Sequence, residues 1–148
     1  MPKVETKIFI EDVDDKVVWD ILVNFEAYPR IMTDVLSVGC FNKNDTGFDS
    51  EWRVLLNGSE LSWIERDDVI PNRKIVFNQI EGDLENWEGY YEIVQEECGV
   101  WVTLVVYFDL GIPSLEEILN PIGINAIRSN SLQILNAIKA QSQTVKYG

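Results

Sequence analysis

The sequence predicts an α+β protein in which a single antiparallel sheet is covered by a long C-terminal helix. Residues 35–109 follow a period of two, typical of strands, whereas segments near both ends have helical spacing. The chain has 148 residues, of which 46% are hydrophobic and 25% charged. These values are ordinary for globular proteins, so we expect one domain, residues 1–148, with a sizeable core.

The first element is a strand and the second a helix. Apolar residues alternate with charged ones over Val4–Ile10, as in a half-buried strand. Asp14 then precedes apolar residues at helical spacing, from Val17 to Phe25, so we expect it to be the N-cap of a helix. Tyr28-Pro29 is expected to end this helix, because proline disfavours the helical conformation of the residue before it.

The centre of the chain predicts six strands joined by short loops rich in Gly, Asn and Asp. Loops this short require neighbouring strands to be antiparallel. The expected strands are Val35–Asn42, Phe48–Leu56, Glu60–Val69, Lys74–Glu81, Asn86–Gln95 and Val100–Asp109.

A long helix follows the last strand. Ser114 and Glu117 have the spacing of a capping box. Pro121 and Gly123 are expected to interrupt the helix near its start. An apolar stripe then marks one face, and this helix is the only expected element long enough to cover the sheet. The stripe consists of Ile124, Ile127, Ile134, Leu135 and Ile138.

Composition excludes several kinds of function. The chain has 12 Lys and Arg against 25 Asp and Glu, giving a net charge of −13. Such a charge repels phosphate backbones and anionic lipids, so neither nucleic acid nor a membrane is an expected partner. There is no histidine, and Cys40 and Cys98 are isolated, so we expect no metal site. The start of the sequence has no signal-like apolar core, which predicts a cytoplasmic protein.

Several segments together resemble the START/Bet v 1-like superfamily, and within it the polyketide aromatase/cyclase branch. The resemblance extends over essentially the whole chain. It rests on Val18-Trp19-Asp20, Phe25-Glu26-Ala27-Tyr28-Pro29, Gly47-Phe48-Asp49, Trp63, Glu65-Arg66, Pro71, Gly82, Gly89-Tyr90-Tyr91 and Phe108-Asp109.

The resemblance implies a helix-grip fold: a curved seven-stranded antiparallel sheet wrapped around the C-terminal helix, two short helices after the first strand, and an internal cavity. It also implies aldol cyclisation and dehydration of a poly-β-ketone chain, presented by an acyl carrier protein and needing no cofactor. Arg30, Lys43 and Arg73 are candidates for a basic patch that docks such a carrier.

The expected catalytic residues depend on the register of the strand Glu60–Val69. The cyclase branch usually has an arginine near its end, and Arg66 is the nearest match. Leu61, Trp63 and Val69, however, alternate with Arg66 and share their face of the strand with Glu65 and Asp67. If that face lines the cavity, Glu65 and Asp67 point inward and Arg66 points outward. An inward Arg66 would stabilise developing negative charge, whereas buried carboxyl groups would transfer protons. Tyr28 is a further candidate proton donor or pocket seal.

Aromatic and apolar residues on the expected inner faces are candidates for binding the substrate, since small-molecule pockets are mostly apolar with a few polar groups. Each of them could equally be ordinary core. The candidates are Met32, Phe48, Trp52, Trp63, Gln79, Tyr91 and Val106.

A different class of function remains open. The last strand is apolar at every position of its inner parity (Val102, Leu104, Val106 and Phe108), where some cyclases have polar groups. A carrier for a quinone or lipid needs no acid or base, so this strand favours a non-enzymatic binding protein. The sequence does not predict the oligomeric state.

Overall fold

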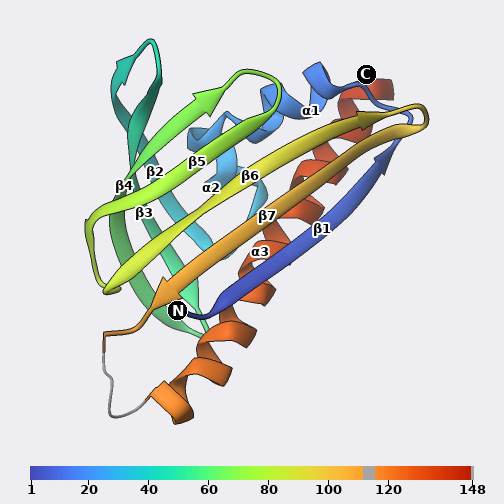
Figure 1. The fold of residues 1–148 in the computed structure, drawn as a ribbon. Coiled ribbons are helices and arrows are strands. Elements are labelled where there is room, and N and C mark those ends of the chain that lie inside the picture. The colour runs from blue at the N-terminus through green and yellow to red at the C-terminus, as the bar shows by residue number, and fades with distance from the viewer. Residues whose placement is uncertain (112–115, 148) are drawn as a thin grey trace.

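The computed structural model describes residues 1–111 and 116–147. Seven strands form one sheet, with three short helical segments after the first strand and one long helix at the end (Figure 1). The elements are β1 (Lys3–Glu11), α1 (Asp15–Leu22), η1 (Phe25–Ala27), α2 (Tyr28–Ile31), β2 (Val35–Asn44), β3 (Gly47–Leu56), β4 (Ser59–Ile70), β5 (Lys74–Gly82), β6 (Asn86–Glu96), β7 (Gly99–Asp109) and α3 (Glu116–Tyr147).

All neighbouring strands are antiparallel, in the order β1-β7-β6-β5-β4-β3-β2. The sheet curves around α3, and α1 lies near the far end of that helix (Figure 1). The core fills the space between them. It includes the stripe residues Ile127, Ile134, Leu135 and Ile138, all of them buried. The α+β helix-grip prediction is therefore confirmed, and each predicted strand is present to within two residues at either end.

The helical region after β1 differs from the prediction. Asp14 caps α1 as expected, since its carboxylate accepts a hydrogen bond from the Val17 amide at 3.0 Å. The helix ends at Leu22, however, and Tyr28 begins α2 rather than ending α1. Pro29 fits this place because the first turn of a helix leaves its amide groups unpaired and needs no donor from proline.

The expected interruption of α3 is also wrong, because the helix runs through both Pro121 and Gly123. Gly123 instead allows close packing: a Cβ atom there would lie 3.1 Å from the Phe108 ring on β7. The capping box depends on Ser114 and on the Glu117 side chain, which lie outside the described residues.

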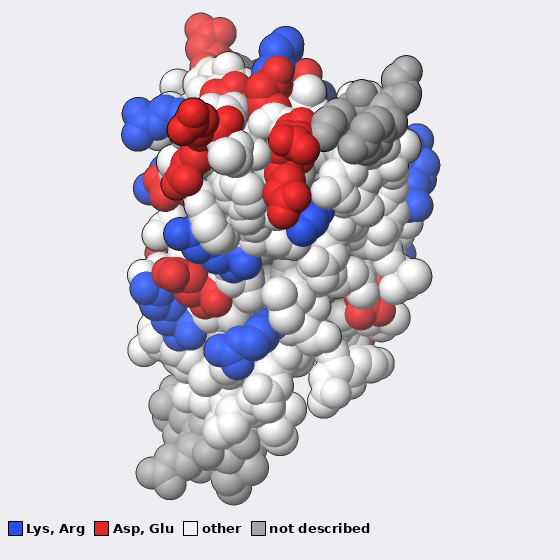
Figure 2. All heavy atoms as spheres, turned by 90° about the vertical axis from the view of Figure 1, so that its right-hand side faces the viewer, with Lys and Arg blue, Asp and Glu red and all other residues white. Residues whose placement is uncertain are grey.

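Acidic and basic side chains are unevenly distributed on the face seen in Figure 2. The acidic groups gather toward one end, basic groups lie beside and below them, and a broad area carries no charge. None of the described helices has the length and apolar composition that a membrane span requires.

Candidate functional site

The register of β4 directs two carboxyl groups into the protein. Trp63, Glu65 and Asp67 share the inner face of this strand and are 5%, 2% and 0% exposed. On β3 the partners of Glu65 and Trp63 are Ser50 and Trp52, so polar and aromatic side chains form adjacent cross-strand pairs. The structure thus favours the alternative in which Glu65 and Asp67 point inward.

Hydrogen bonds fix both carboxyl groups. The indole of Trp63 donates to Glu65 Oε1 at 2.7 Å. The Ser50 hydroxyl donates to Asp67 Oδ2 at 2.5 Å and accepts a hydrogen bond from the Trp52 indole at 2.8 Å. Asp67 Oδ1 is buried with no hydrogen-bond partner among the described residues.

The environment of this pair favours holding a proton. Burial raises the pKa of Glu65 well above its ordinary value, and the nearby charge of Asp67 raises it further. Burial also raises the pKa of Asp67, from 3.8 to about 6, while hydrogen bonds from Glu65 and Ser50 oppose that rise. Glu65 is therefore the member of the pair whose environment favours the protonated form more strongly.

Aromatic rings surround the carboxyl groups. The rings of Trp52 and Trp63 are stacked, with centroids 6.0 Å apart and an interplanar angle of 7°. Trp63 also contacts Trp87 at 4.7 Å, and Trp87 stacks on Phe77 at 6.0 Å. These rings make the low-dielectric wall that keeps Glu65 from water.

An internal cavity lies between this wall and α3. Its volume is about 20 Å³, room for about one water molecule. Asn130 and Ser131 on α3 face Glu65 across an otherwise apolar lining. The lining consists of Trp52, Val54, Trp63, Glu65, Phe77, Trp87, Tyr91, Leu104, Val106, Asn130, Ser131 and Ile134.

An outer groove of about 400 Å³ adjoins the cavity beside α3. Asn130 lines both spaces and is 8% exposed, and its Nδ2 donor has no hydrogen-bond partner among the described residues. The other groove residues include Asp34, Asn57 and Asn125, so the groove is more polar than the cavity. The groove is a route by which a ligand could reach Glu65.

The expected substrate-binding residues are only partly brought together. Trp52, Trp63, Tyr91 and Val106 line the cavity. Met32 and Phe48 do not line it, although Met32 is buried in the core and Phe48 packs edge-on against Phe25. The amide of Gln79 donates to the Leu84 carbonyl at 2.8 Å and lies in a separate hollow between β5 and β6.

Tyr28 is fully buried, and its hydroxyl donates to the Leu22 carbonyl at 2.5 Å. Burial raises the pKa of Tyr28 well above its ordinary value, so the phenol stays protonated. This contact ties α2 to the end of α1. It leaves the hydroxyl proton engaged away from the cavity.

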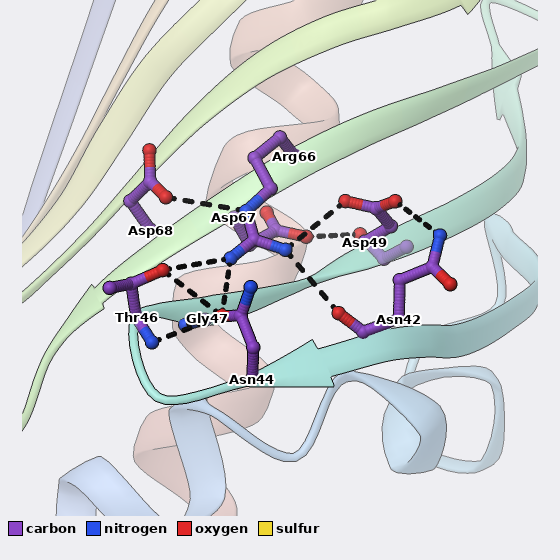
Figure 3. A network of polar contacts seen from close by, with 9 residues as sticks. Asn42, Asn44, Thr46, Gly47, Asp49, Arg66, Asp67 and Asp68 are labelled. Carbon is purple, nitrogen blue, oxygen red and sulfur yellow. Dashed lines mark hydrogen bonds and ion pairs between the residues drawn. The ribbon is translucent and has the colours of Figure 1, made fainter.

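Arg66 lies on the opposite face of β4 from the cavity, where it joins the β2–β3 hairpin to β4 (Figure 3). Its Nη2 donates to Asn44 Oδ1 at 2.7 Å and to Thr46 Oγ1 at 3.0 Å. Its guanidinium also pairs with Asp49 at 3.4 Å and Asp68 at 3.3 Å. The structure therefore does not bring Arg66 to the cavity.

Phe77, Trp87 and the neighbours Asn130 and Ser131 line the cavity and were missed by sequence reasoning. Trp87 has the same strand parity as Tyr91, so its inner position was available from the pattern. Asn130 and Ser131 interrupt the apolar stripe of α3 between Ile127 and Ile134, which is the signal for polar groups facing a core. Among the described residues no group of three or more Cys, Asp or Glu side chains is arranged to hold a metal ion.

The comparisons with known proteins agree with this architecture. The family model described as "Polyketide cyclase / dehydrase and lipid transport" matches residues 12–133. No curated protein matches.

Three solved structures show the same fold at low sequence identity. The Thermus thermophilus protein TTHA0849 has a TM-score of 0.89 and 19% identity, covering 97% of this chain and 99% of its own. The Zhui aromatase/cyclase from a Streptomyces species has a TM-score of 0.85 and 16% identity, with 96% and 93% covered. A START superfamily protein from Mycobacterium smegmatis has a TM-score of 0.81 and 14% identity, with 97% and 98% covered.

Proposed function

Because the chain belongs to the polyketide cyclase/dehydrase and lipid transport family, we propose that it is a polyketide cyclase. It binds a poly-β-ketone chain between the sheet and α3 and directs aldol closure followed by loss of water. The observation that carries this proposal is the buried pair Glu65 and Asp67 beside an aromatic cavity, where burial raises the pKa of both carboxyl groups.

The pair can perform both proton transfers of an aldol closure. The hydrogens between two carbonyls of a poly-β-ketone are acidic, so a carboxylate of raised pKa is a sufficient base. The proton of Glu65 moves to Asp67, and the freed Glu65 carboxylate takes the α-proton as the carbon–carbon bond forms. Glu65 then passes that proton to the oxygen of the attacked carbonyl, and the pair again holds one proton.

Loss of water uses the same groups. With the resident proton on Asp67, Glu65 takes a second α-proton and then delivers it to the departing hydroxyl, so that one water molecule leaves, a double bond forms and the pair again holds one proton. The Trp63 indole holds the Glu65 carboxyl in place throughout. Asp67 acts through Glu65 and is a positioning residue, because Glu65 is the member that lines the cavity.

Binding requires the cavity to expand. Ligand pockets occupy about 300–1,000 Å³, against about 20 Å³ here. The ligand enters from the outer groove past Asn130, whose free Nδ2 donates to a ligand carbonyl. The tryptophan rings shift outward, and α3 moves away from the sheet.

A second candidate is a carrier for a quinone or lipid. The inner face of β7 supports it, since Val102, Leu104 and Val106 are all buried and bring no polar side chain to the ligand. The family description also includes lipid transport.

One experiment separates the two. The protein is added to a minimal synthase, consisting of a ketosynthase and an acyl carrier protein, that makes a poly-β-ketone. The cyclase proposal predicts a changed ring pattern in the products. Unchanged products, together with tight binding of a quinone such as menadione, would overturn it in favour of the carrier.

A further inference from the structure

The sheet is interrupted between β5 and β6, close to Glu65. The pairing of these strands ends at Asn78 and Glu88, although β5 continues to Gly82. A bulge lies at the same point in the pairing of β5 with β4: Glu65 pairs with Gln79 and Ile64 with Glu81, which leaves Ile80 as an extra residue. Beyond Asn78, β5 is thus paired with β4 but not with β6, which leaves a gap between β5 and β6.

A polar hollow of about 70 Å³ occupies this gap, with more room than a single water molecule needs. Its outer rim is exposed to solvent, and every lining residue except Trp87 is an amide or a carboxylate. The lining consists of Asn78, Gln79, Glu85, Asn86, Trp87 and Glu88.

Two residues that line this hollow, Gln79 and Trp87, each have a buried polar atom without a hydrogen-bond partner among the described residues. The Gln79 side chain is anchored by its Nε2, which donates to the Leu84 carbonyl, while its Oε1 acceptor is buried without a partner among the described residues. Trp87 is 7% exposed, and its Nε1 donor is likewise without a hydrogen bond of normal geometry. An unpaired buried polar group costs about 1–3 kcal/mol, and one water can satisfy a donor and an acceptor together.

Trp87 connects the hollow with the cavity, since it lines both. Its indole N–H favours the ionised form of Glu65 and so lowers the pKa of that carboxyl, against the larger effect of burial. Glu65 is also the cross-strand partner of Gln79. Gln79 and Trp87, which line the hollow, are therefore neighbours of Glu65, the proton-carrying group of the proposed site.

We propose that this hollow is a water port, in which water binds between Gln79 Oε1 and Trp87 Nε1 and links Glu65 to solvent. The role of the port rests on the proposed function: each dehydration releases one water molecule, which leaves through the port while the ligand blocks the groove at Asn130. Gln79 and Trp87 are positioning residues for that water.

Water binding is tested without any ligand by the exchange of indole N–H protons with solvent, followed by NMR. Trp52 and Trp63 are internal references, because their N–H groups donate to Ser50 and Glu65. The chain has five tryptophans, so the variants Trp52→Phe, Trp63→Phe and Trp87→Phe assign the three indole signals that are compared. We expect Trp87 to exchange at least about tenfold faster than both references and to show magnetisation transfer from water. Exchange as slow as that of the references would overturn the port.

Two variants separate the water from the anchor. Gln79→Met removes both the acceptor and the hydrogen bond to Leu84. Gln79→Glu keeps an acceptor oxygen, but it loses the hydrogen bond to Leu84 and adds a carboxyl group. Transfer from water to Trp87 should be lost in Gln79→Met and kept in Gln79→Glu. Equal loss in both variants, or retention in both, would contradict water held by Oε1.

The role in dehydration has a separate readout. If the wild-type protein changes the ring pattern, Gln79→Met should raise the share of cyclised products that still carry the hydroxyl group, with Gln79→Glu closer to wild type. An unchanged share would overturn the role. If the wild-type protein leaves the ring pattern unchanged, the proposed function fails and the role fails with it, whereas transfer from water to Trp87 would still support the water site.

Discussion

Glu65 and Asp67 lie two residues apart on the inner face of β4, and burial raises the pKa of the two carboxyl groups unequally: that of Glu65 well above its ordinary value and that of Asp67 to about 6. The inequality arises from their surroundings. Asp67 accepts a hydrogen bond from the Ser50 hydroxyl, and the charge of Arg66 lowers its pKa, whereas Glu65 accepts a hydrogen bond from Trp63 in the apolar cavity.

The raised pKa of Asp67 predicts how stability depends on pH. Between 3.8 and about 6 the folded protein retains a proton that the unfolded chain has released, so this group's contribution to the free energy of unfolding falls as pH rises. We therefore expect the free energy of unfolding of Asp67→Asn, measured with urea, to rise relative to that of wild type by about 2–3 kcal/mol as the pH increases from 3.5 to 7. Asp68→Asn, which alters an exposed carboxylate on the same strand, is the control. A constant difference between wild type and Asp67→Asn across this range would refute the raised pKa.

Arg66 is expected to stabilise the β2–β3 hairpin rather than a reaction intermediate. Arg66→Ala removes hydrogen bonds to Asn44 and Thr46 and two ion pairs, at a cost of about 1–2 kcal/mol in unfolding free energy. The ring pattern of the products should not change at a temperature where the variant is folded. A variant with full stability and altered products would instead give Arg66 a catalytic role.

Tyr28→Phe tests whether that hydroxyl serves structure or chemistry. The hydroxyl is buried and bonded to the Leu22 carbonyl, so its removal leaves a buried acceptor unpaired and should cost about 1–3 kcal/mol in thermal or urea unfolding. Product pattern and turnover should be those of wild type. Loss of turnover without loss of stability would be the opposite result.

Gly82 determines the position of Trp63. A Cβ atom at Gly82 would lie 2.4 Å from the Trp63 Cβ and 2.7 Å from its Cα, so Gly82→Ala must displace β4 or β5. We expect a loss of about 1–3 kcal/mol in unfolding free energy and a shifted Trp63 indole signal. Gly39→Ala is the matched control, because nothing lies within 4 Å of a Cβ atom there. If the two variants had equal unfolding free energies, the strands would accommodate a Cβ atom at Gly82 without cost, and the prediction would be wrong.

Strand positions could be predicted from the sequence because alternation and short polar turns are local signals. The helix breaks could not. The end of α1 at Leu22 and the passage of α3 through Pro121 depend on packing against the sheet, as at Gly123 and Phe108. The register of β4 stayed open because charged residues ordinarily face solvent. The parity of Leu61 and Trp63 outweighs that preference, and Ser50 and the indole groups offset the burial of the carboxyl groups.

The most direct measurement compares Glu65→Gln with Glu51→Gln in the minimal-synthase assay. Glu51 is an exposed carboxylate on β3 and controls for loss of charge. We expect Glu65→Gln to form the products directed by the wild-type protein at least about tenfold more slowly, while urea unfolding shows that the variant is folded and Glu51→Gln behaves as wild type. A wild-type ring pattern and rate for Glu65→Gln would contradict proton transfer by this pair.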